Sequence, residues 1–171
     1  MRMLGILTAV LLTLVVSGRS DENKGSQAMK GQTVILGTWR WDIETNKQGD
    51  TNGTDVWWAH ETEKESFLVP QNGAGLVVLG KKEFDKITRE NLAALKYSDE
   101  KLAKELLSPG TVVAMRTNEG NFAKLKVVKY RELHDFSFPD AKFLEKGMKE
   151  RFLKEPNRNY HIEVKWVLYL K

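Results

Sequence analysis

Residues 111–130, with the sequence TVVAMRTNEGNFAKLKVVKY, decide the fold because they combine two strand-like runs with a turn. Thr111 to Thr117 and Phe122 to Tyr130 are rich in β-branched and apolar residues, and Asn118-Glu119-Gly120-Asn121 separates them. Glycine can take the positive φ that tight turns between antiparallel strands require. This stretch therefore predicts a β-hairpin, with a positive φ at Gly120.

Other strand-like segments lie on both sides of this hairpin. They alternate apolar and polar side chains or form short apolar runs bounded by turn residues, as half-buried strands do. The expected strands are residues 34–44, 55–61, 66–69, 76–79 and 161–170. We expect the first two to pair as a hairpin. The last should be paired within the sheet, because a free apolar edge would promote aggregation.

Two segments have the residue spacing of short amphipathic helices. Residues 81–107 are expected to form two helices, with Thr88 and Ser98 as their N-caps, and residues 140–154 a third. Strands and helices do not alternate regularly. The predicted fold class is therefore α+β: an antiparallel sheet or a small, partly open β-barrel of about six or seven strands with two or three short inserted helices.

The composition limits the possible functions. The chain has 171 residues, no cysteine and a formal net charge of +4. Its 41% hydrophobic and 29% charged residues are typical of a soluble globular domain. The absence of cysteine excludes disulfides, thiol nucleophiles and cysteine-ligated metals. The small, dispersed positive charge argues against nucleic acid as a partner.

Residues 1–18 have the pattern of a secretory signal peptide, because Arg2 precedes an apolar run that small residues follow. The fourteen residues from Met3 to Val16 would span about 21 Å as a helix, which is short of a hydrocarbon core of about 30 Å. We expect a periplasmic or extracellular protein that contacts the membrane only through an uncleaved signal segment. A flexible tether is expected over residues 19–32 and a single β-rich domain over residues 33–171.

Five tryptophans are the most unusual feature of the sequence, and four lie on the first two expected strands. Alternation places Trp39, Trp41 and Trp166 on the apolar face. Neighbouring strand residues point to opposite faces, so Trp57 faces outward if Trp58 faces the core. An exposed tryptophan is a candidate contact for a ligand. The ligand-binding candidates are Trp57, Trp58, His60 and Arg40.

Sequence signatures of catalysis are absent: there is no nucleophile elbow, phosphate loop or zinc-protease motif. Hydrolysis nevertheless remains an alternative. Asp42 and Glu44 lie about 6.5–7 Å apart on one strand face, which Arg40 shares, and could act as an acid–base pair. His60, beside Glu61, is a further candidate for acid–base chemistry. The ordinary interpretation is a solvated sheet face and a surface histidine. We predict no catalytic residue, metal or cofactor.

Two local resemblances bear on fold and function. Gly37-Thr38-Trp39 resembles the G-x-W start of lipocalin-like barrels. Residues 115–127, MRTNEGNFAKLKV, resemble a hairpin of exported β-rich bacterial proteins that include the haem-binding HmuY-like family. Two shorter segments are similar to other parts of that family: Trp41-Asp42-Ile43 and Phe84-Asp85-Lys86-Ile87. The second resemblance implies a bacterial origin and a sheet-rich fold. Because that family holds haem through histidines and the matched hairpin has none, haem binding is not carried over.

These observations favour a non-enzymatic, exported binding or interaction module of a bacterial cell envelope. Its partner would be a protein, a glycan or an apolar ligand. The alternatives are a hydrolytic enzyme that uses carboxylates and histidine on the first two strands, and a lipocalin-like carrier of an apolar ligand.

Overall fold

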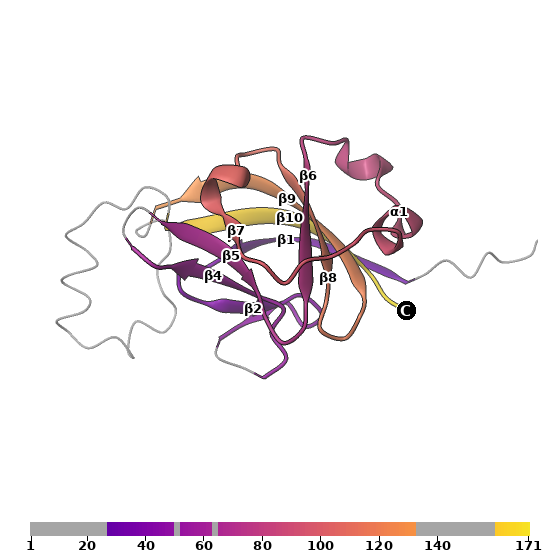
Figure 1. Ribbon diagram of the computed structural model, residues 1–171, viewed down its shortest axis with the longest axis horizontal. Coiled ribbons are helices and arrows are strands. Elements are labelled where there is room, and N and C mark those ends of the chain that lie inside the picture. The colour runs from indigo at the N-terminus through magenta and orange to yellow at the C-terminus, as the bar shows by residue number, and fades with distance from the viewer. Residues whose placement is uncertain (1–26, 50–51, 63–64, 133–159) are drawn as a thin grey trace, which may run out of the picture.

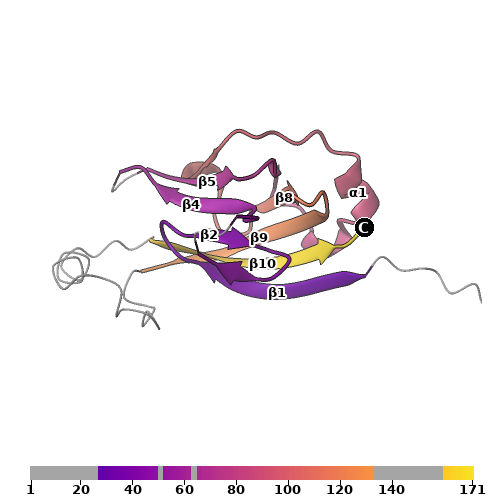
Figure 2. The same ribbon diagram turned by 90° about the horizontal axis from the view of Figure 1, so that it is seen from below.

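The structure is a computed structural model that describes residues 27–49, 52–62, 65–132 and 160–171 (Figure 1). The strands form two antiparallel five-stranded sheets that pack face to face (Figure 2). Sheet A contains, in spatial order, β1 (Ala28–Ile35), β10 (His161–Tyr169), β9 (Phe122–Arg131), β8 (Val112–Arg116) and β6 (Gly75–Gly80). Sheet B contains β3 (Lys47–Gln48), β2 (Arg40–Asp42), β4 (Val56–His60), β5 (Ser66–Pro70) and β7 (Leu102–Ala103).

The hairpin predicted from residues 111–130 is confirmed. β8 and β9 pair in antiparallel register, and Gly120 in their turn has a φ of +79°. β10, the strand predicted from residues 161–170, lies between β9 and β1 as an interior strand. Its apolar side chains are therefore paired and covered, as expected for a strand of this composition.

The first predicted strand, residues 34–44, is divided between the two sheets. β1 ends at Ile35 and β2 begins at Arg40, and the chain turns between them at Thr38, whose φ is +63°. The predicted hairpin of the first two strands survives as the pairing of β2 with β4. Alternation of apolar and polar residues continues across the break, so the sequence pattern did not reveal it.

The sheet begins earlier in the chain than predicted. β1 starts at Ala28, which lies inside the segment 19–32 expected to be a tether and before the expected start of the domain at residue 33. Residues 28–32 pair with residues 165–169 of β10. Pairing with a distant strand gives this polar segment a regular structure that its own sequence does not indicate. The signal segment 1–18 lies outside the described residues.

Less helix is present in the described residues than predicted. α1 (Arg89–Ala93) follows Thr88, whose hydroxyl accepts a hydrogen bond from the Asn91 N–H, so this N-cap is confirmed. The helix predicted after Ser98 is wrong, because Ser98 and Leu76 exchange two backbone hydrogen bonds that hold the segment extended. β7 and the 3₁₀ turn η2 (Lys104–Leu106) follow. The helix predicted over residues 140–154 lies outside the described residues.

The fold class is thus confirmed as antiparallel and rich in strands, but the strand arrangement differs from the prediction. The described strands form two open sheets in place of one sheet or a partly open barrel of six or seven strands. The short pieces of sheet B account for the difference, since β2, β3 and β7 have only two or three residues each. Strands this short leave little periodic signal in a sequence.

Tryptophan fills the core between the sheets. Trp41 and Trp58 are fully buried and Trp166 is 4% exposed. Each indole N–H donates to a protein oxygen at 2.9–3.1 Å, and the acceptors are Asn46 Oδ1, the Tyr160 carbonyl and Thr33 Oγ1. Large aromatic side chains are therefore buried without an unpaired donor. Gly31 makes room for Trp166, because a Cβ at this position would lie 2.6 Å from the Trp166 ring.

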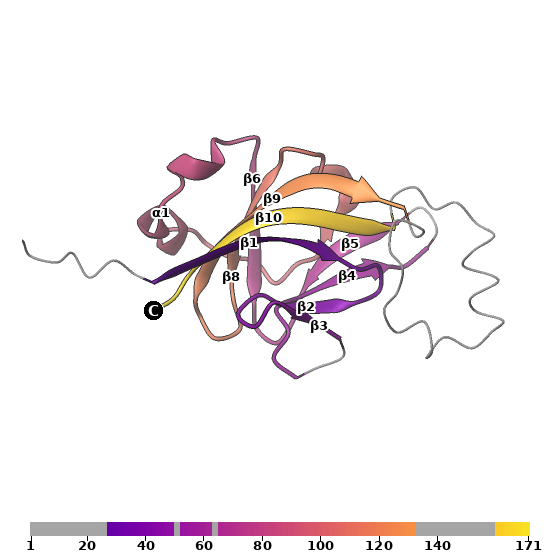
Figure 3. The ribbon, with the colours of Figure 1, turned by 180° about the vertical axis from the view of Figure 1, so that it is seen from behind.

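A second apolar cluster covers the outer face of sheet A. Phe84 in the 3₁₀ turn η1 (Phe84–Lys86), together with Ile87 and Leu92, packs on β8. The buried Lys124 of β9 donates from Nζ to the carbonyls of Phe84 and Ile87, both at 2.7 Å. α1 and η1 are held in this way at the end of sheet A where β1 begins (Figure 3). Among the described residues, no helix is long and apolar enough to cross a membrane.

Candidate functional site

Trp39, Arg40 and Trp57 lie where β2 begins and pairs with β4, and we call these three residues the aromatic surface. Trp39 is 37% exposed and Trp57 is half-buried. Arg40 stands opposite Trp57 in the β2–β4 register, and its guanidinium carbon lies 6.0 Å from the centre of the Trp57 ring. An open cavity of about 450 Å³ lies beside Trp39 and Arg40 and is lined by Thr38, Trp39, Arg40 and Gly49.

The exposure of Trp39 corrects the expectation that this residue lies in the core. Its backbone is paired, because its N–H donates to the Leu36 carbonyl and its carbonyl accepts from the Trp58 N–H, both at 3.1 Å. The positive φ of Thr38 redirects the chain just before it, so Trp39 does not continue the buried face of β1. A large apolar side chain is thereby held at the surface by a well-paired backbone.

Trp57 and Trp58 face opposite sides of β4. Trp58 is fully buried and donates its indole N–H to the Tyr160 carbonyl at 3.1 Å. Trp57 lies half-buried on the other side, beside Arg40. The geometry expected from strand alternation is present. As a candidate ligand contact Trp57 keeps an accessible surface, whereas Trp58 offers none.

The ring nitrogens of His60 both contact protein groups. Nε2 lies 2.9 Å from the Tyr160 carbonyl and Nδ1 lies 3.0 Å from Ser66 Oγ. A carbonyl can only accept, so Nε2 carries the proton and Nδ1 accepts from the Ser66 hydroxyl. The ring also stacks on Tyr160 at 4.6 Å. Burial lowers the pKa of His60, which favours the neutral ring. His60 therefore stabilises the end of β4 rather than presenting a free nitrogen.

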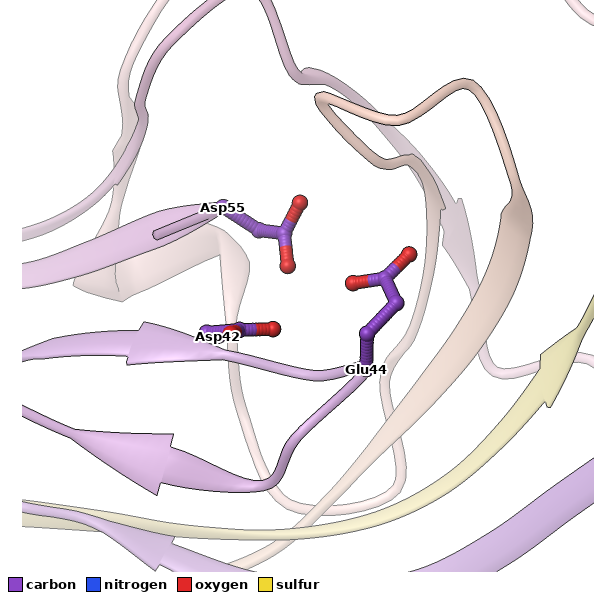
Figure 4. A group of neighbouring side chains, drawn as sticks. All are labelled: Asp42, Glu44 and Asp55. Carbon is purple, nitrogen blue, oxygen red and sulfur yellow. The ribbon is translucent and has the colours of Figure 1, made fainter. Parts of the chain in front are cut away.

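A second group of polar side chains lies near the other end of β4. Asp42, Glu44 and Asp55 place carboxylate oxygens within 4.8 Å of one another, and their carboxyl groups converge in Figure 4. Asp55 is fully buried and accepts backbone hydrogen bonds from Ile43 at 3.0 Å and Asn118 at 2.9 Å. These bonds tie β2, β4 and the β8–β9 turn together.

The pKa of Asp55 is raised to about 8, chiefly by burial; the nearby charge of Glu44 acts in the same direction, and the two backbone hydrogen bonds oppose both. Asp55 therefore carries a proton at neutral pH. Glu44 accepts from Asn121 Nδ2 at 2.9 Å, and its other oxygen is buried without a hydrogen-bond partner. Carboxylate oxygens can also hold a divalent cation. In this cluster, however, the proton on Asp55 already reduces the repulsion between the acids.

The hydrolase alternative needs Asp42, Glu44 and His60 in one cleft, and the structure brings only the two carboxylates together. His60 ends β4 whereas Asp55 precedes it, which separates their backbones by about 16 Å along an extended strand. Sequence reasoning missed the part that Asp55 plays in the cluster. Asp55 lies directly before an apolar strand, which could have indicated that its carboxylate is buried. Its contact with Asn118 could not be predicted locally, because Asn118 belongs to the β8–β9 turn, far away in the sequence.

Comparisons with known proteins identify the fold. The chain is similar to the crystal structure of the apo HmuY analog from Tannerella forsythia, with a TM-score of 0.50 and 12% sequence identity. The match covers 87% of this chain and 100% of that one. No protein-family model matches the sequence, and no curated protein matches it either. At this identity the likeness concerns the fold, and it agrees with the sheet-rich, HmuY-like resemblance of the sequence. The two stacked sheets with a tryptophan-filled core do not support the lipocalin-like alternative.

Proposed function

We propose that this protein is an exported, non-enzymatic binding module of a bacterial cell envelope, and that its ligand is an acidic glycan bound at the aromatic surface. The observation that carries the proposal is the exposure of Trp39 beside Arg40 and an open cavity. The fold is already stabilised by three buried tryptophans, so it has no need of a fourth at the surface. Large apolar side chains that form an exposed patch commonly mark a binding site on a protein surface.

The chemistry of the aromatic surface supports this class of ligand. Tryptophan rings offer flat apolar faces on which the apolar face of a sugar ring can pack. A guanidinium forms paired hydrogen bonds with a carboxylate or phosphate. Because Arg40 lies against the Trp57 ring, its position is restricted before any ligand arrives. The combination favours a ring-bearing ligand with an anionic group over a purely apolar one.

The cellular setting of the proposal rests on two further observations. Residues 1–18 have the pattern of a secretory signal. The fold resembles that of the HmuY analog from Tannerella forsythia. Extraction of the protein from periplasm or culture medium with its first residues removed would support export. Recovery of the full-length chain from the cytoplasm alone would contradict it.

Binding can be tested by titrating the protein with an oligogalacturonate of defined length and, separately, with the neutral cello-oligosaccharide of the same length. We expect calorimetry to detect the acidic sugar and to give a much weaker signal for the neutral one. Trp39→Ala and Arg40→Gln should each raise the Kd at least tenfold, which corresponds to about 1.4 kcal/mol. Leu106→Ala is the matched control, because Leu106 is also exposed but lies on η2.

Loss of affinity in Trp39→Ala with none in Leu106→Ala would support the proposed site. Equal affinity of the wild-type protein and the Trp39→Ala and Arg40→Gln variants would exclude the aromatic surface as the binding site. Absence of binding to any acidic oligosaccharide would overturn the glycan. Circular dichroism of each variant separates loss of binding from loss of fold.

A further inference from the structure

A second cavity of about 580 Å³ lies between the end of β6 and the segment that contains η1 and α1. Its lining combines apolar and basic side chains, and we call it the lysine groove. The apolar contacts are Leu79, Ile87 and Leu95, and the basic ones are Lys81, Lys82 and Lys86. A volume of this size is within the range of cavities that bind small organic molecules.

The lysine groove has an excess of positive charge. Three lysines face one acidic lining residue, Glu83, whose carboxylate pairs with Lys86 at 2.8 Å. In the part of the chain that the structure describes, neither Lys81 nor Lys82 makes an ion pair. The groove therefore presents two uncompensated cations above an apolar surface. A ligand complementary to it carries an anionic group at one end and an apolar body at the other.

The wall of the lysine groove is held in place by contacts from below. Lys124 donates to the carbonyls of Phe84 and Ile87 at 2.7 Å, and the Tyr169 hydroxyl donates to the same Ile87 carbonyl at 3.3 Å. The capping box formed by Thr88 and Asn91 fixes the start of α1. A ligand that enters the groove thus meets an ordered wall and loses little affinity to ordering the protein.

From this arrangement we infer that the lysine groove binds a single-chain anionic amphiphile, such as a fatty acid, with its carboxylate at Lys81 and Lys82 and its chain on Leu79 and Leu95. A small inorganic anion would leave the apolar wall unused. A neutral lipid would leave the two lysines without a partner. Charge complementarity and the half-buried leucines together favour the amphiphile over either.

This site is separate from the aromatic surface. Ala28 of β1 pairs with Tyr169, which contacts Ile87 in the groove wall, whereas Ile35 at the other end leads into the connection before Trp39. The two ends of β1 are about 23 Å apart. The inference therefore goes beyond the proposed function and does not depend on it.

Calorimetric titration with dodecanoate, kept below its micellar concentration, tests the inference. We expect one binding event per chain, with butyrate and dodecyl maltoside each binding at least tenfold more weakly. The double variant Lys81→Gln/Lys82→Gln should raise the Kd for dodecanoate at least tenfold, and Leu95→Gln should do the same. Lys129→Gln is the matched control, because it removes one exposed lysine from β9, outside the groove.

Three results would overturn the inference: no binding of dodecanoate, equal binding of dodecyl maltoside, or equal affinity in the groove variants and the wild-type protein. Binding to anionic vesicles without binding to monomeric dodecanoate would point to a membrane surface and would also overturn it. Trp39→Ala should bind dodecanoate normally. That variant separates failure of this inference from failure of the proposed glycan site.

Discussion

Sheet A and sheet B reach the same antiparallel geometry by different means. In sheet A, β1, β9 and β10 have eight to ten residues each, and long ladders of backbone hydrogen bonds join them. In sheet B, β2, β3 and β7 have two or three residues each, and side chains supply bonds that the ladders lack. Gln48 of β3, for example, joins sheet B to the end of β1, because its side chain accepts from the Leu36 N–H and donates to the Val34 carbonyl, both at 2.8 Å. Sheet B thus depends on a few individual side chains, and it also carries the aromatic surface.

The largest effect should come from the tryptophan that anchors sheet B. Trp58→Ala removes a fully buried ring and one of the two hydrogen bonds that the Tyr160 carbonyl accepts, so the free energy of unfolding should fall by about 3–5 kcal/mol. Trp57→Ala should cost less than about 1 kcal/mol, because this ring is half-exposed. Urea denaturation of both variants measures the difference. Equal, large losses would show that both tryptophans are structural and would weaken the aromatic surface as a site.

A smaller loss of stability is expected for Lys124 of β9, which binds the segment of η1 and Ile87 to the outer face of sheet A. Lys124→Met leaves two buried carbonyls without their charged donor and should cost about 2–3 kcal/mol. Hydrogen exchange should then accelerate in residues 82–95 more than in β8 and β10. Lys126→Met, a half-buried lysine on the same strand and face, is the control and should change little. Uniform acceleration across sheet A would contradict a local role for Lys124.

The β8–β9 turn tests whether the long ladders of sheet A tolerate local strain. Gly120 has a φ of +79°, which a β-branched residue adopts only with strain, so Gly120→Val should cost about 1–2 kcal/mol. Gly120→Asn should cost less, since asparagine tolerates this conformation better. Thermal melting of the two variants gives the comparison. Equal melting temperatures for valine and glycine would mean that the turn relaxes without strain.

A pH dependence of stability is also expected, and sheet B owes it to Asp55. Its pKa is about 8 in the folded protein against an ordinary value of 3.8, so the folded state holds an extra proton between these values. The resulting stabilisation is complete below about pH 4 and is lost as the pH rises toward 8. Between pH 6.5 and 8.5 the free energy of unfolding should therefore fall, by at most about 1.4 kcal/mol per pH unit.

Glu44→Gln sharpens this measurement. It keeps the oxygen that accepts from Asn121 but removes the negative charge beside Asp55, so the pKa of Asp55 should fall and the slope should become shallower. Burial, the largest cause, persists, so part of the slope should remain. His60 does not interfere, because its lowered pKa affects stability only below about pH 6.5, and in the opposite sense. An identical slope in wild type and Glu44→Gln would mean that Glu44 does not influence Asp55.

What could be predicted from the sequence follows the same division between the sheets. The β8–β9 hairpin and β10 have clear local patterns: the sequence predicts the hairpin with its pairing, and predicts β10 as a strand paired within the sheet without naming its partners. The break between β1 and β2 was not predicted, because the alternation continues through Thr38 and only a positive φ marks the turn. The start of β1 at Ala28 was missed because a polar segment becomes a strand only through its distant partner.

The candidate sites divide in a similar way. Alternation alone predicts that Trp57 and Trp58 face opposite sides, and the sequence indicates Arg40 and Trp57 as candidates, whereas their contact arises from the pairing of β2 with β4. Trp39 was misplaced because its exposure depends on the turn before it. The lysine groove had no local signature, since its residues come from a strand end, a 3₁₀ turn and a helix that only the folded chain brings together.

The pairing of β1 with β10 has a consequence for the order of events during biogenesis. Ala28 stands opposite Tyr169, so the first strand of sheet A lacks its neighbour until the last one has been synthesised. Contacts this distant along the chain form slowly, because a long loop must close before they add stability. Sheet A therefore cannot be completed before β10 has been synthesised. During synthesis, β1 thus waits for a hydrogen-bonding partner that follows all the other strands of both sheets.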